Sequence, residues 1–370
     1  MGNQDRVVVV HDYLTQRGGA ERVTLELMRT FPDARLVTSC WSPLSTFTEF
    51  VDYDVETLWL NKVGAFRSDP RRAFPFLAQA FADYVIDDSD VVICSSSGWA
   101  HRVTSKVPKL VYCHNPARWL YQPDDYFEGM PTWARSMFRA STDRLRQSDA
   151  IAAEGAAAYM VNSSAVAGRV RQAYGLEADV LPPPRGLTPA GPMDPISGLE
   201  PGFLLTISRL RGYKHTERVI EAMGQLPDER LVVLGGRPEW ASERVVVLNG
   251  LSDAGLRWLY ANAGALVAVA HEDFGLTTVE AQAFGVPSVV LRAGGYLDST
   301  VEGSTGLFID ESTPDAIARG VRELRAQRWS PDKIRALGAA YAPEAFQARM
   351  LDAVDSVLRP MQQGPALLAV

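Results

Sequence analysis

The chain has 370 residues, of which 46% are hydrophobic and 22% charged, a composition typical of soluble globular proteins. A chain of this length is too long for one hydrophobic core of ordinary size, so two domains are expected. The formal net charge of −7 argues against a nucleic-acid-binding protein, because such proteins present basic surfaces to the phosphate backbone.

The start of the chain and its cysteines predict a cytoplasmic location. The apolar run at 7–10 is too short for a signal peptide, and no segment approaches the roughly 18 apolar residues of a transmembrane helix. Cys40, Cys94 and Cys113 lie in or beside strand-like runs, which predicts buried free thiols in a reducing compartment. Without a Cys-x-x-Cys motif or a close histidine pair, no metal site is expected.

Short runs rich in valine, isoleucine and leucine alternate with longer amphipathic segments in the first half of the chain. Continuous apolar runs indicate strands buried on both faces of a parallel sheet, joined by helices in right-handed crossovers. The predicted strands are 6–11, 34–41, 90–96, 109–114 and 158–163, and the predicted helices are 20–31, 131–147 and 164–174.

Residues 182–202 are dense in proline and glycine and are predicted to be an interdomain linker. The alternation then restarts without a sequence repeat, so the fold class predicted is α/β with two Rossmann-like halves. The second half has predicted strands at 203–208, 230–236, 245–250, 265–270, 287–295 and 305–310, predicted helices at 215–226 and 253–263, and a last helix at 342–360.

Candidate binding residues are those at the carboxyl ends of the strands, where open parallel sheets bind ligands. Gly18 and Gly19 open the first helix, where free amides favour an anion or a hydroxyl, although a tight turn explains them equally well. They do not form the dinucleotide fingerprint Gly-x-Gly-x-x-Gly. His114 ends a strand before Asn-Pro, where it would either meet a ligand or satisfy loop carbonyls.

In the second half, Arg209 follows a predicted strand and Lys214 lies near the start of the next helix. Two cations at a helix entry can clamp a phosphate or diphosphate, and the alternative is a solvated basic loop.

The stretch 271–280, HEDFGLTTVE, follows another predicted strand. Thr277 and Glu280 fit a capping box with Thr277 as the N-cap. In an alternative interpretation, the amides near 275–278 face a phosphate and Glu280 accepts hydrogen bonds from a vicinal diol such as ribose. A hydrolase with Glu272 and Glu280 as acid and base is disfavoured, because one loop and its helix would put both on one side of the substrate.

Taken together, several stretches resemble glycosyltransferase family four, the retaining GT-B enzymes. The similarity runs in order over nearly the whole chain and includes RGGAE (17–21), YCHNP (112–116), VNSS with the following YG, PPP (182–184), SRL with YK (208–214), and EDFGLTTVEAQAFGVP (272–287). The last stretch matches the family's Glu-x7-Glu motif. The form EDFG, followed by AQAFG and AGGYLD, looks most like a bacterial mannosyltransferase-type subgroup.

The resemblance implies a GT-B architecture with a central cleft between the two domains. An acceptor-binding domain would span 1–183, a nucleotide-sugar-binding domain 184–341, and a helix with a tail at 342–370 would pack back on the first domain. Gly18 and Gly19 would line the cleft, and His114 would lie beside the transferred sugar.

For the donor, a GDP- or UDP-sugar is expected and no metal or other cofactor. Arg209 and Lys214 would bind the diphosphate, Glu280 the ribose, and Glu272 with the following loop the sugar. The donor-site residues implied are thus Arg209, Lys214, Glu272, Phe274, Gly275, Leu276, Thr277 and Glu280, with His114, Arg209, Lys214 and Glu272 also implied in catalysis.

The expected reaction is transfer of a sugar, with mannose as one candidate, to a glycan, lipid-linked or small-molecule hydroxyl by same-face displacement. Arginines among apolar residues at 65–74 and 133–146 also suit peripheral contact with anionic lipid at the inner face of the membrane, the alternative being solvated helices. Two other functions stay open: a GT-B nucleotide-sugar epimerase and a catalytically silent binding subunit. No nucleic acid partner is expected.

Overall fold

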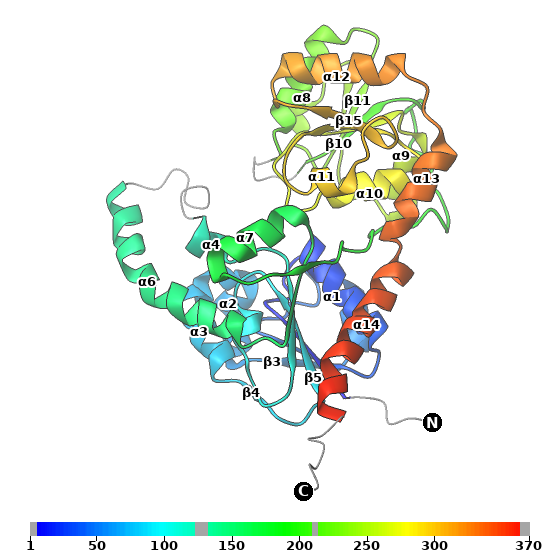
Figure 1. Cartoon of the computed structure of the whole chain (residues 1–370). Helices are drawn as coiled ribbons and strands as arrows, with labels where there is room; N and C mark the ends of the chain where they lie inside the picture. Colours follow the sequence, from blue (N-terminus) through cyan, green and yellow to red (C-terminus); the bar gives the residue numbers. More distant parts are fainter. Residues whose placement is uncertain (1–5, 123–131, 209–213, 363–370) are drawn as a thin grey trace, which may run out of the picture. The chain divides into compact units, whose positions relative to one another are not determined.

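The computed structural model describes residues 6–122, 132–208 and 214–362, except for the side chains of 132–141 and 360–362. The chain divides into two compact units, coloured in Figure 1 along the sequence. The first unit is Met1–Pro182 with Pro343–Val370, and the second is Pro183–Ala342. The fold is therefore α/β in both halves, as predicted.

The first unit is built on a seven-stranded sheet in which all neighbours run parallel. Its spatial order is β3-β2-β1-β5-β7-β8-β9, and a separate pair, β4 with β6, lies outside it. The strands are β1 Val7–His11, β2 Arg35–Thr38, β3 Val55–Thr57, β4 Val85–Ile86, β5 Val91–Ser96, β6 Thr104–Ser105, β7 Lys109–Cys113, β8 Ala158–Val161 and β9 Asp179–Val180.

Both faces of this sheet are buried, which explains the continuous apolar runs. On β1, Val8 and Val10 belong to one hydrophobic cluster, whereas Val7 and Val9 belong to the other. The helices of the unit are α1 Gly19–Thr30, α2 Gly64–Ser68, α3 Phe74–Ala82, α4 Arg118–Tyr121, α6 Thr132–Glu154, α7 Ser164–Tyr174 and α14 Pro343–Gln362.

The last helix, α14, belongs to the core of the first unit (Figure 1). Phe346, Met350, Val354 and Leu358 recur every fourth residue and form one apolar stripe, which packs into the cluster under β1. Gln347 donates a hydrogen bond to Glu26 of α1 at 2.6 Å. The expected return of the final helix to the first domain is thus present.

The second unit has a six-stranded sheet, also with parallel neighbours throughout, in the order β12-β11-β10-β13-β14-β15. Its strands are β10 Leu204–Ile207, β11 Leu231–Leu234, β12 Val245–Leu248, β13 Ala265–Ala268, β14 Ser288–Leu291 and β15 Gly306–Ile309. Its helices are α8 Thr216–Ala222, α9 Asp253–Asn262, α10 Leu276–Ala283, α11 Tyr296–Ser299, α12 Pro314–Ala326 and α13 Pro331–Gly338.

The order of the strands defines where a ligand would bind in each unit. In both sheets the order reverses once, at β1/β5 in the first unit and at β10/β13 in the second. Loops leave in opposite directions at such a switch point, which opens a crevice beyond the carboxyl ends of the two strands.

The predicted strands and helices are present, and the proline-rich stretch 182–202 contains neither, as expected. Its interpretation as a linker is wrong, however. Leu187 and Leu199 are buried in a core cluster with β10 and α9, so the stretch is part of the second unit. No helix of the described residues is long and apolar enough to span a membrane.

Candidate functional site

The switch point of the second unit carries a partly buried ion pair. Lys214 lies in the loop from β10 to α8, and Glu272 lies in the loop from β13 to α10. Because β10 and β13 are adjacent, the two side chains meet, and Lys214 Nζ contacts Glu272 Oε1. Both side chains are largely shielded from solvent. A cation and a carboxylate thus lie together at this edge, whereas Arg209 lies outside the described residues.

Helix α10 begins beside this pair, and it is not capped as a capping box would require. Gly275 is the N-cap, with φ 88°, and no side chain caps the helix. The threonine whose hydroxyl contacts the start of the helix is Thr278 and not Thr277. It donates a hydrogen bond to Gly275 O at 2.7 Å. The capping-box prediction is therefore wrong, because a left-handed glycine sets the start of the helix two residues earlier. Leu276 and Thr277 occupy the first turn, and their two amides have no acceptor within the helix.

Glu280 lies farther along α10 and is held by a tyrosine that the sequence analysis did not single out. Tyr260 of α9 is buried and donates its hydroxyl proton to Glu280 Oε2 at 2.7 Å. Its ring stacks on Phe284, with centroids 5.6 Å apart. The two contacts fix the direction of the Glu280 carboxylate.

Two further glycines, missed as site residues, hold the 272–275 loop in place. The amide of Gly295 donates to Glu272 O at 3.0 Å. A Cβ on Gly295 would lie 2.2 Å from Phe274 Cα, and one on Gly294 would lie 2.3 Å from Glu272 O. Only glycine allows such an approach of two backbones. The sequence feature that could have pointed to Gly294 and Gly295 is that they form a pair of glycines before a helix, as Gly18 and Gly19 do.

In the first unit, Gly18 is the N-cap of α1 and Gly19 is its first residue. The buried carboxyl group of Glu21 lies against Gly18, since a Cβ there would meet Glu21 Oε2 at 2.4 Å. A carboxylate in the first turn already interacts favourably with the helix dipole. A second anion would be repelled there, so this helix start suits a hydroxyl better than a phosphate.

His114 follows β7 and is almost fully buried. Its Nε2 lies 2.8 Å from Ser95 Oγ on the neighbouring strand β5. Burial lowers its pKa to about 3, with a further contribution from His11. The ring is therefore neutral near pH 7 and can contact a ligand only through hydrogen bonds or packing.

Asp12, just after β1, is a buried carboxyl group that organises the loop after β5. It accepts hydrogen bonds from the amides of Ser97, Trp99 and Ala100, at 2.6 to 3.0 Å. Burial raises its pKa, while His11 and the hydrogen bonds from Ser97 and Ala100 oppose the rise. Asp12 is thus committed to backbone structure at the switch point of the first unit.

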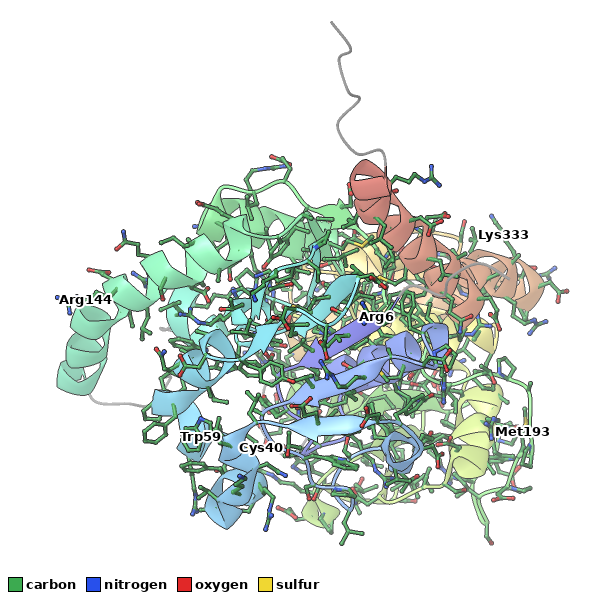
Figure 2. The ribbon with its side chains drawn as sticks, turned by 90° about the horizontal axis from the view of Figure 1, so that it is seen from below. Arg6, Cys40, Trp59, Arg144, Met193 and Lys333 are labelled. Atoms are coloured by element: carbon green, nitrogen blue, oxygen red, sulfur yellow. The ribbon has the colours of Figure 1, made fainter. Side chains whose placement is uncertain are left out.

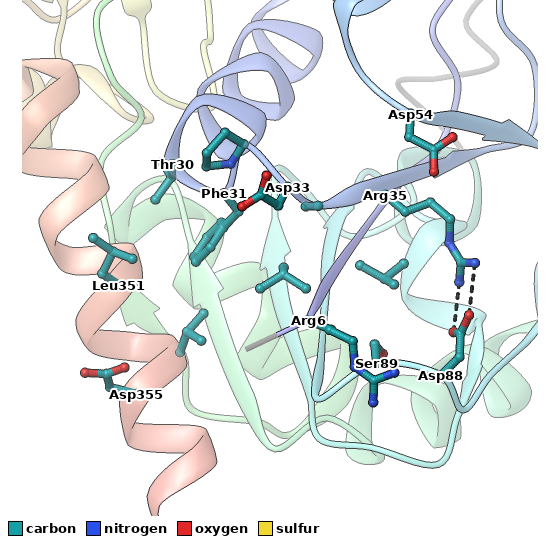
Figure 3. A pocket seen from close by; sticks show the side chains of 15 residues that line it. Arg6, Thr30, Phe31, Asp33, Arg35, Asp54, Asp88, Ser89, Leu351 and Asp355 are labelled. Carbon is teal, nitrogen blue, oxygen red and sulfur yellow. Dashed lines mark hydrogen bonds and ion pairs between the residues drawn. The ribbon is translucent and has the colours of Figure 1, made fainter. Parts of the chain in front are cut away.

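A cavity of about 620 Å³ in the first unit has none of these residues in its lining (Figure 3). It is lined by Arg6 before β1, by Arg35 at the start of β2, by Asp88 and Ser89 before β5, and by Leu351 of α14. It therefore lies at the amino ends of the strands, opposite the edge where ligands of such sheets bind. Arg35 and Asp88 form a bidentate ion pair at its wall.

Residues 195–339 match the family described as glycosyl transferases group 1. The chain carries a group 1 glycosyl transferase domain. This match covers nearly all of the second unit, including Lys214, Glu272 and Glu280, and it confirms the resemblance drawn from the sequence.

Curated relatives of the chain align over part of their length. A D-inositol 3-phosphate glycosyltransferase of Corynebacterium urealyticum is 31% identical over 171 residues, which is 40% of this chain and 39% of the relative. A GDP-mannose-dependent alpha-(1-6)-phosphatidylinositol monomannoside mannosyltransferase of Mycolicibacterium smegmatis is 29% identical over 160 residues, 37% of this chain and 41% of the relative. The chain thus aligns with about two fifths of each relative.

The similarity in fold extends over both units. The Anabaena protein Alr3699/HepE, solved in complex with UDP-glucose, has a TM-score of 0.68 to this chain at 17% identity. The alignment covers 95% of this chain and 99% of the Anabaena chain. At this identity the comparison shows the fold, which is that of GT-B glycosyltransferases.

Proposed function

We propose that the protein is a retaining glycosyltransferase that moves a sugar from a nucleotide-diphosphate sugar to an acceptor hydroxyl. The observation that carries the proposal is the Lys214–Glu272 pair beside the uncapped start of α10, at the switch point of a group 1 glycosyl transferase domain. A cation and free helix amides suit a diphosphate, and a carboxylate suits sugar hydroxyls.

In this proposal the donor lies along the carboxyl edge of the second unit. Lys214, Arg209 and the amides of Gly275, Leu276 and Thr277 bind the diphosphate, with Phe274 behind them in the core. Glu272 accepts hydrogen bonds from the donor sugar, and Glu280 accepts them from the ribose diol. Lys214 then exchanges its contact with Glu272 for the phosphate, which leaves Glu272 available to the sugar.

The proposed chemistry is a same-face displacement through an oxocarbenium-like state. Asp12, a buried carboxyl group at the matching edge of the first unit, already accepts three backbone hydrogen bonds and is a poor nucleophile. The leaving phosphate would therefore deprotonate the acceptor, while Lys214, Arg209 and helix amides neutralise its charge without a metal ion. Gly18, Gly19 and neutral His114 would contact hydroxyls.

The donor and acceptor are proposed from the relatives. One relative is named as GDP-mannose-dependent and acts on a phosphatidylinositol mannoside, and the Anabaena structure contains UDP-glucose. A GDP- or UDP-hexose donor, with mannose as the first candidate, and a polyol or glycolipid acceptor are the choices these names support.

The deciding experiment incubates the full chain with GDP-, UDP- and dTDP-sugars, with and without inositol phosphates and glycolipid acceptors. A transferase releases free nucleotide diphosphate in proportion to a new glycoside. An epimerase changes the sugar without releasing nucleotide, and a silent binding subunit does neither. Either of the last two results would overturn the proposal in favour of that alternative.

Replacing Tyr260 with phenylalanine is expected to weaken binding of the nucleotide diphosphate roughly threefold to tenfold, because Glu280 loses the hydrogen bond that orients it. Isothermal titration calorimetry measures the affinity for the nucleotide diphosphate. The matched control is Tyr112→Phe, which removes a buried tyrosine hydrogen bond to Leu181 O in the other unit and should leave the affinity unchanged. If the Tyr260→Phe variant and the wild type bind the nucleotide diphosphate with equal affinity, Glu280 is not part of the proposed site.

A second proposal, contact with an anionic membrane, rests on a surface of the first unit that we call the aromatic–basic patch. It lies between β3 and the end of α3, and Figure 2 labels Trp59, its exposed tryptophan. Trp59 and Phe76 are 50% and 46% exposed, yet their rings pack together with centroids 6.0 Å apart. The patch also includes Val63, Lys62, Arg67, Arg71 and Arg72, all exposed.

This composition suits an interface between lipid headgroups and acyl chains, where aromatic rings insert and cations meet anionic headgroups. Asp69 neutralises Arg71 through a bidentate pair, which leaves a net positive patch on a chain of net charge −7. The other segment suggested by the sequence, 133–146, is less suited: Arg146 donates to Leu120 O, and the side chains of 133–141 lie outside the described residues.

We expect the protein to float with vesicles containing anionic lipid and not with zwitterionic vesicles, and the double variant Trp59→Ala, Phe76→Ala to lose most of this binding. Added salt should weaken it, because surface charges are screened. Leu44→Ala is the control, since Leu44 is 95% exposed but lies outside the patch. Binding that is the same for both lipid compositions, or the same for the double variant and the wild type, would refute the patch.

A further inference from the structure

Four side chains form a buried hydrogen-bonded cluster at the carboxyl edge of the first unit. Ser95 on β5 is at its centre, with Oγ 2.8 Å from His114 Nε2, 2.9 Å from Thr24 Oγ1 and 3.1 Å from His11 Nδ1. Ser95 and Thr24 are fully buried, and His11 is 2% exposed. The proposed ligand residue His114 is thus tied to three elements through one hydroxyl.

The neighbours of the cluster decide which atom carries each proton. His11 Nδ1 also lies 3.0 Å from Ser95 O, a carbonyl that can only accept, so His11 Nδ1 carries a proton. Thr24 donates its single proton to Ala20 O at 3.0 Å. Thr24 Oγ1 must then accept the proton of Ser95.

These assignments leave Ser95 Oγ with no proton for His114. Its two lone pairs accept from His11 Nδ1 and from His114 Nε2, so the proton of the His114 ring is on Nε2. A neutral imidazole carries one N–H, and its other nitrogen is an acceptor. His114 Nδ1 therefore has a bare lone pair.

We propose that Ser95 is a positioning residue that holds His114 in the Nε2–H tautomer, so that Nδ1 accepts a hydrogen bond from a hydroxyl of the bound substrate. This inference rests on the proposed function, because it takes His114 to face the sugar or the acceptor. It defines the chemical class of the contact: a hydroxyl can donate to Nδ1, whereas a carbonyl or phosphate oxygen would meet another lone pair and be rejected.

The tautomer is measurable without any substrate. Nuclear magnetic resonance of the full chain labelled with 15N-histidine distinguishes a protonated ring nitrogen from a bare one. For His114 we expect a protonated Nε2 and a bare Nδ1. Thr24→Val removes the acceptor of the Ser95 proton, which then turns to His114 Nε2 and moves the ring proton to Nδ1. Ser95→Ala should give a mixture of tautomers.

Ser96→Ala is the matched control on the same strand. Ser96 Oγ contacts a different ring, His101 Nδ1 at 2.9 Å, so this variant should shift the His101 signals and leave the His114 tautomer unchanged. A bare Nε2 in the wild type, or a His114 tautomer unaffected by both Thr24→Val and Ser95→Ala, would overturn the role of Ser95. If one variant fails to fold, the other still provides the test.

Kinetics test the contact with substrate separately. Ser95→Ala is expected to lower kcat/KM about fivefold to tenfold, the value of one oriented hydrogen bond. With a donor or acceptor that lacks the contacting hydroxyl, Ser95→Ala should not change kcat/KM. If Ser95→Ala lowered kcat/KM by the same factor for every deoxy analogue, the contact would be excluded. Absence of turnover in the wild type would refute the proposed function, while the tautomer experiment would still decide what Ser95 does.

Discussion

Replacing Lys214 with methionine is expected to cost about 2–4 kcal/mol of transition-state stabilisation, roughly a 30- to 1000-fold loss of kcat/KM. Methionine keeps most of the length of the side chain and removes the charge that would neutralise the leaving diphosphate. Steady-state kinetics with the donor identified in the nucleotide-sugar panel measures the loss. Lys333→Met, at an exposed position of the same unit, is the matched control and should leave kcat/KM unchanged.

The ion pair with Glu272 offers a second explanation for a loss of kcat/KM in Lys214→Met. A double-mutant cycle distinguishes the two explanations. If Lys214 acted only by holding Glu272, then Lys214→Met would cause no further loss in a Glu272→Gln background. If Lys214 contacts the phosphate, a large loss remains in that background. Near-normal turnover of both Lys214→Met and Arg209→Ala would refute the diphosphate clamp.

Replacing Gly295 with alanine is expected to destabilise the second unit by about 1–3 kcal/mol and to abolish tight donor binding. The added Cβ would lie 2.2 Å from Phe274 Cα and 2.4 Å from Asp273 O, and backbone atoms cannot move aside as a flexible side chain can. The loop carrying Glu272 must therefore shift. Thermal unfolding gives the loss of stability, and calorimetry with the nucleotide diphosphate gives the loss of affinity.

Gly224→Ala is the control for this change, because a Cβ at Gly224 would meet nothing within 4 Å. It should change neither the midpoint of thermal unfolding nor the affinity. A Gly295→Ala protein with the stability and donor affinity of the wild type would show that the backbone of 293–295 does not determine the position of the Glu272 loop.

The parallel sheets were predictable because valine-rich runs such as 7–10 are buried on both faces, a property that needs no knowledge of partners. The short helices α2 and α3 and the pair α12 and α13 were not predicted. The carboxyl ends of the strands were also predictable, and Lys214 and Glu272 were candidates because each follows a predicted strand. The switch point itself follows only from the strand order in the structure.

The supporting contacts of the site could not be predicted from local sequence. Tyr260 and Glu280 lie on different helices, and Gly295 meets Phe274 only because β13 and β14 are neighbours. The start of α10 was misplaced for a related reason. A capping box is a local pattern, whereas the left-handed conformation of Gly275 accompanies the packing of Tyr296, whose ring fills the space where a Cβ would project.

The stripe Phe346, Met350, Val354 and Leu358 has a consequence for the order of events during synthesis. These side chains belong to the same hydrophobic cluster as Val7 and Val9 of β1, a strand that is synthesised before the whole of the second unit. Domains of long chains commonly fold one after another as they emerge. That face of the first unit lacks α14 until the second unit has been translated, so we expect folding of the first unit to be completed only after α14 has been synthesised.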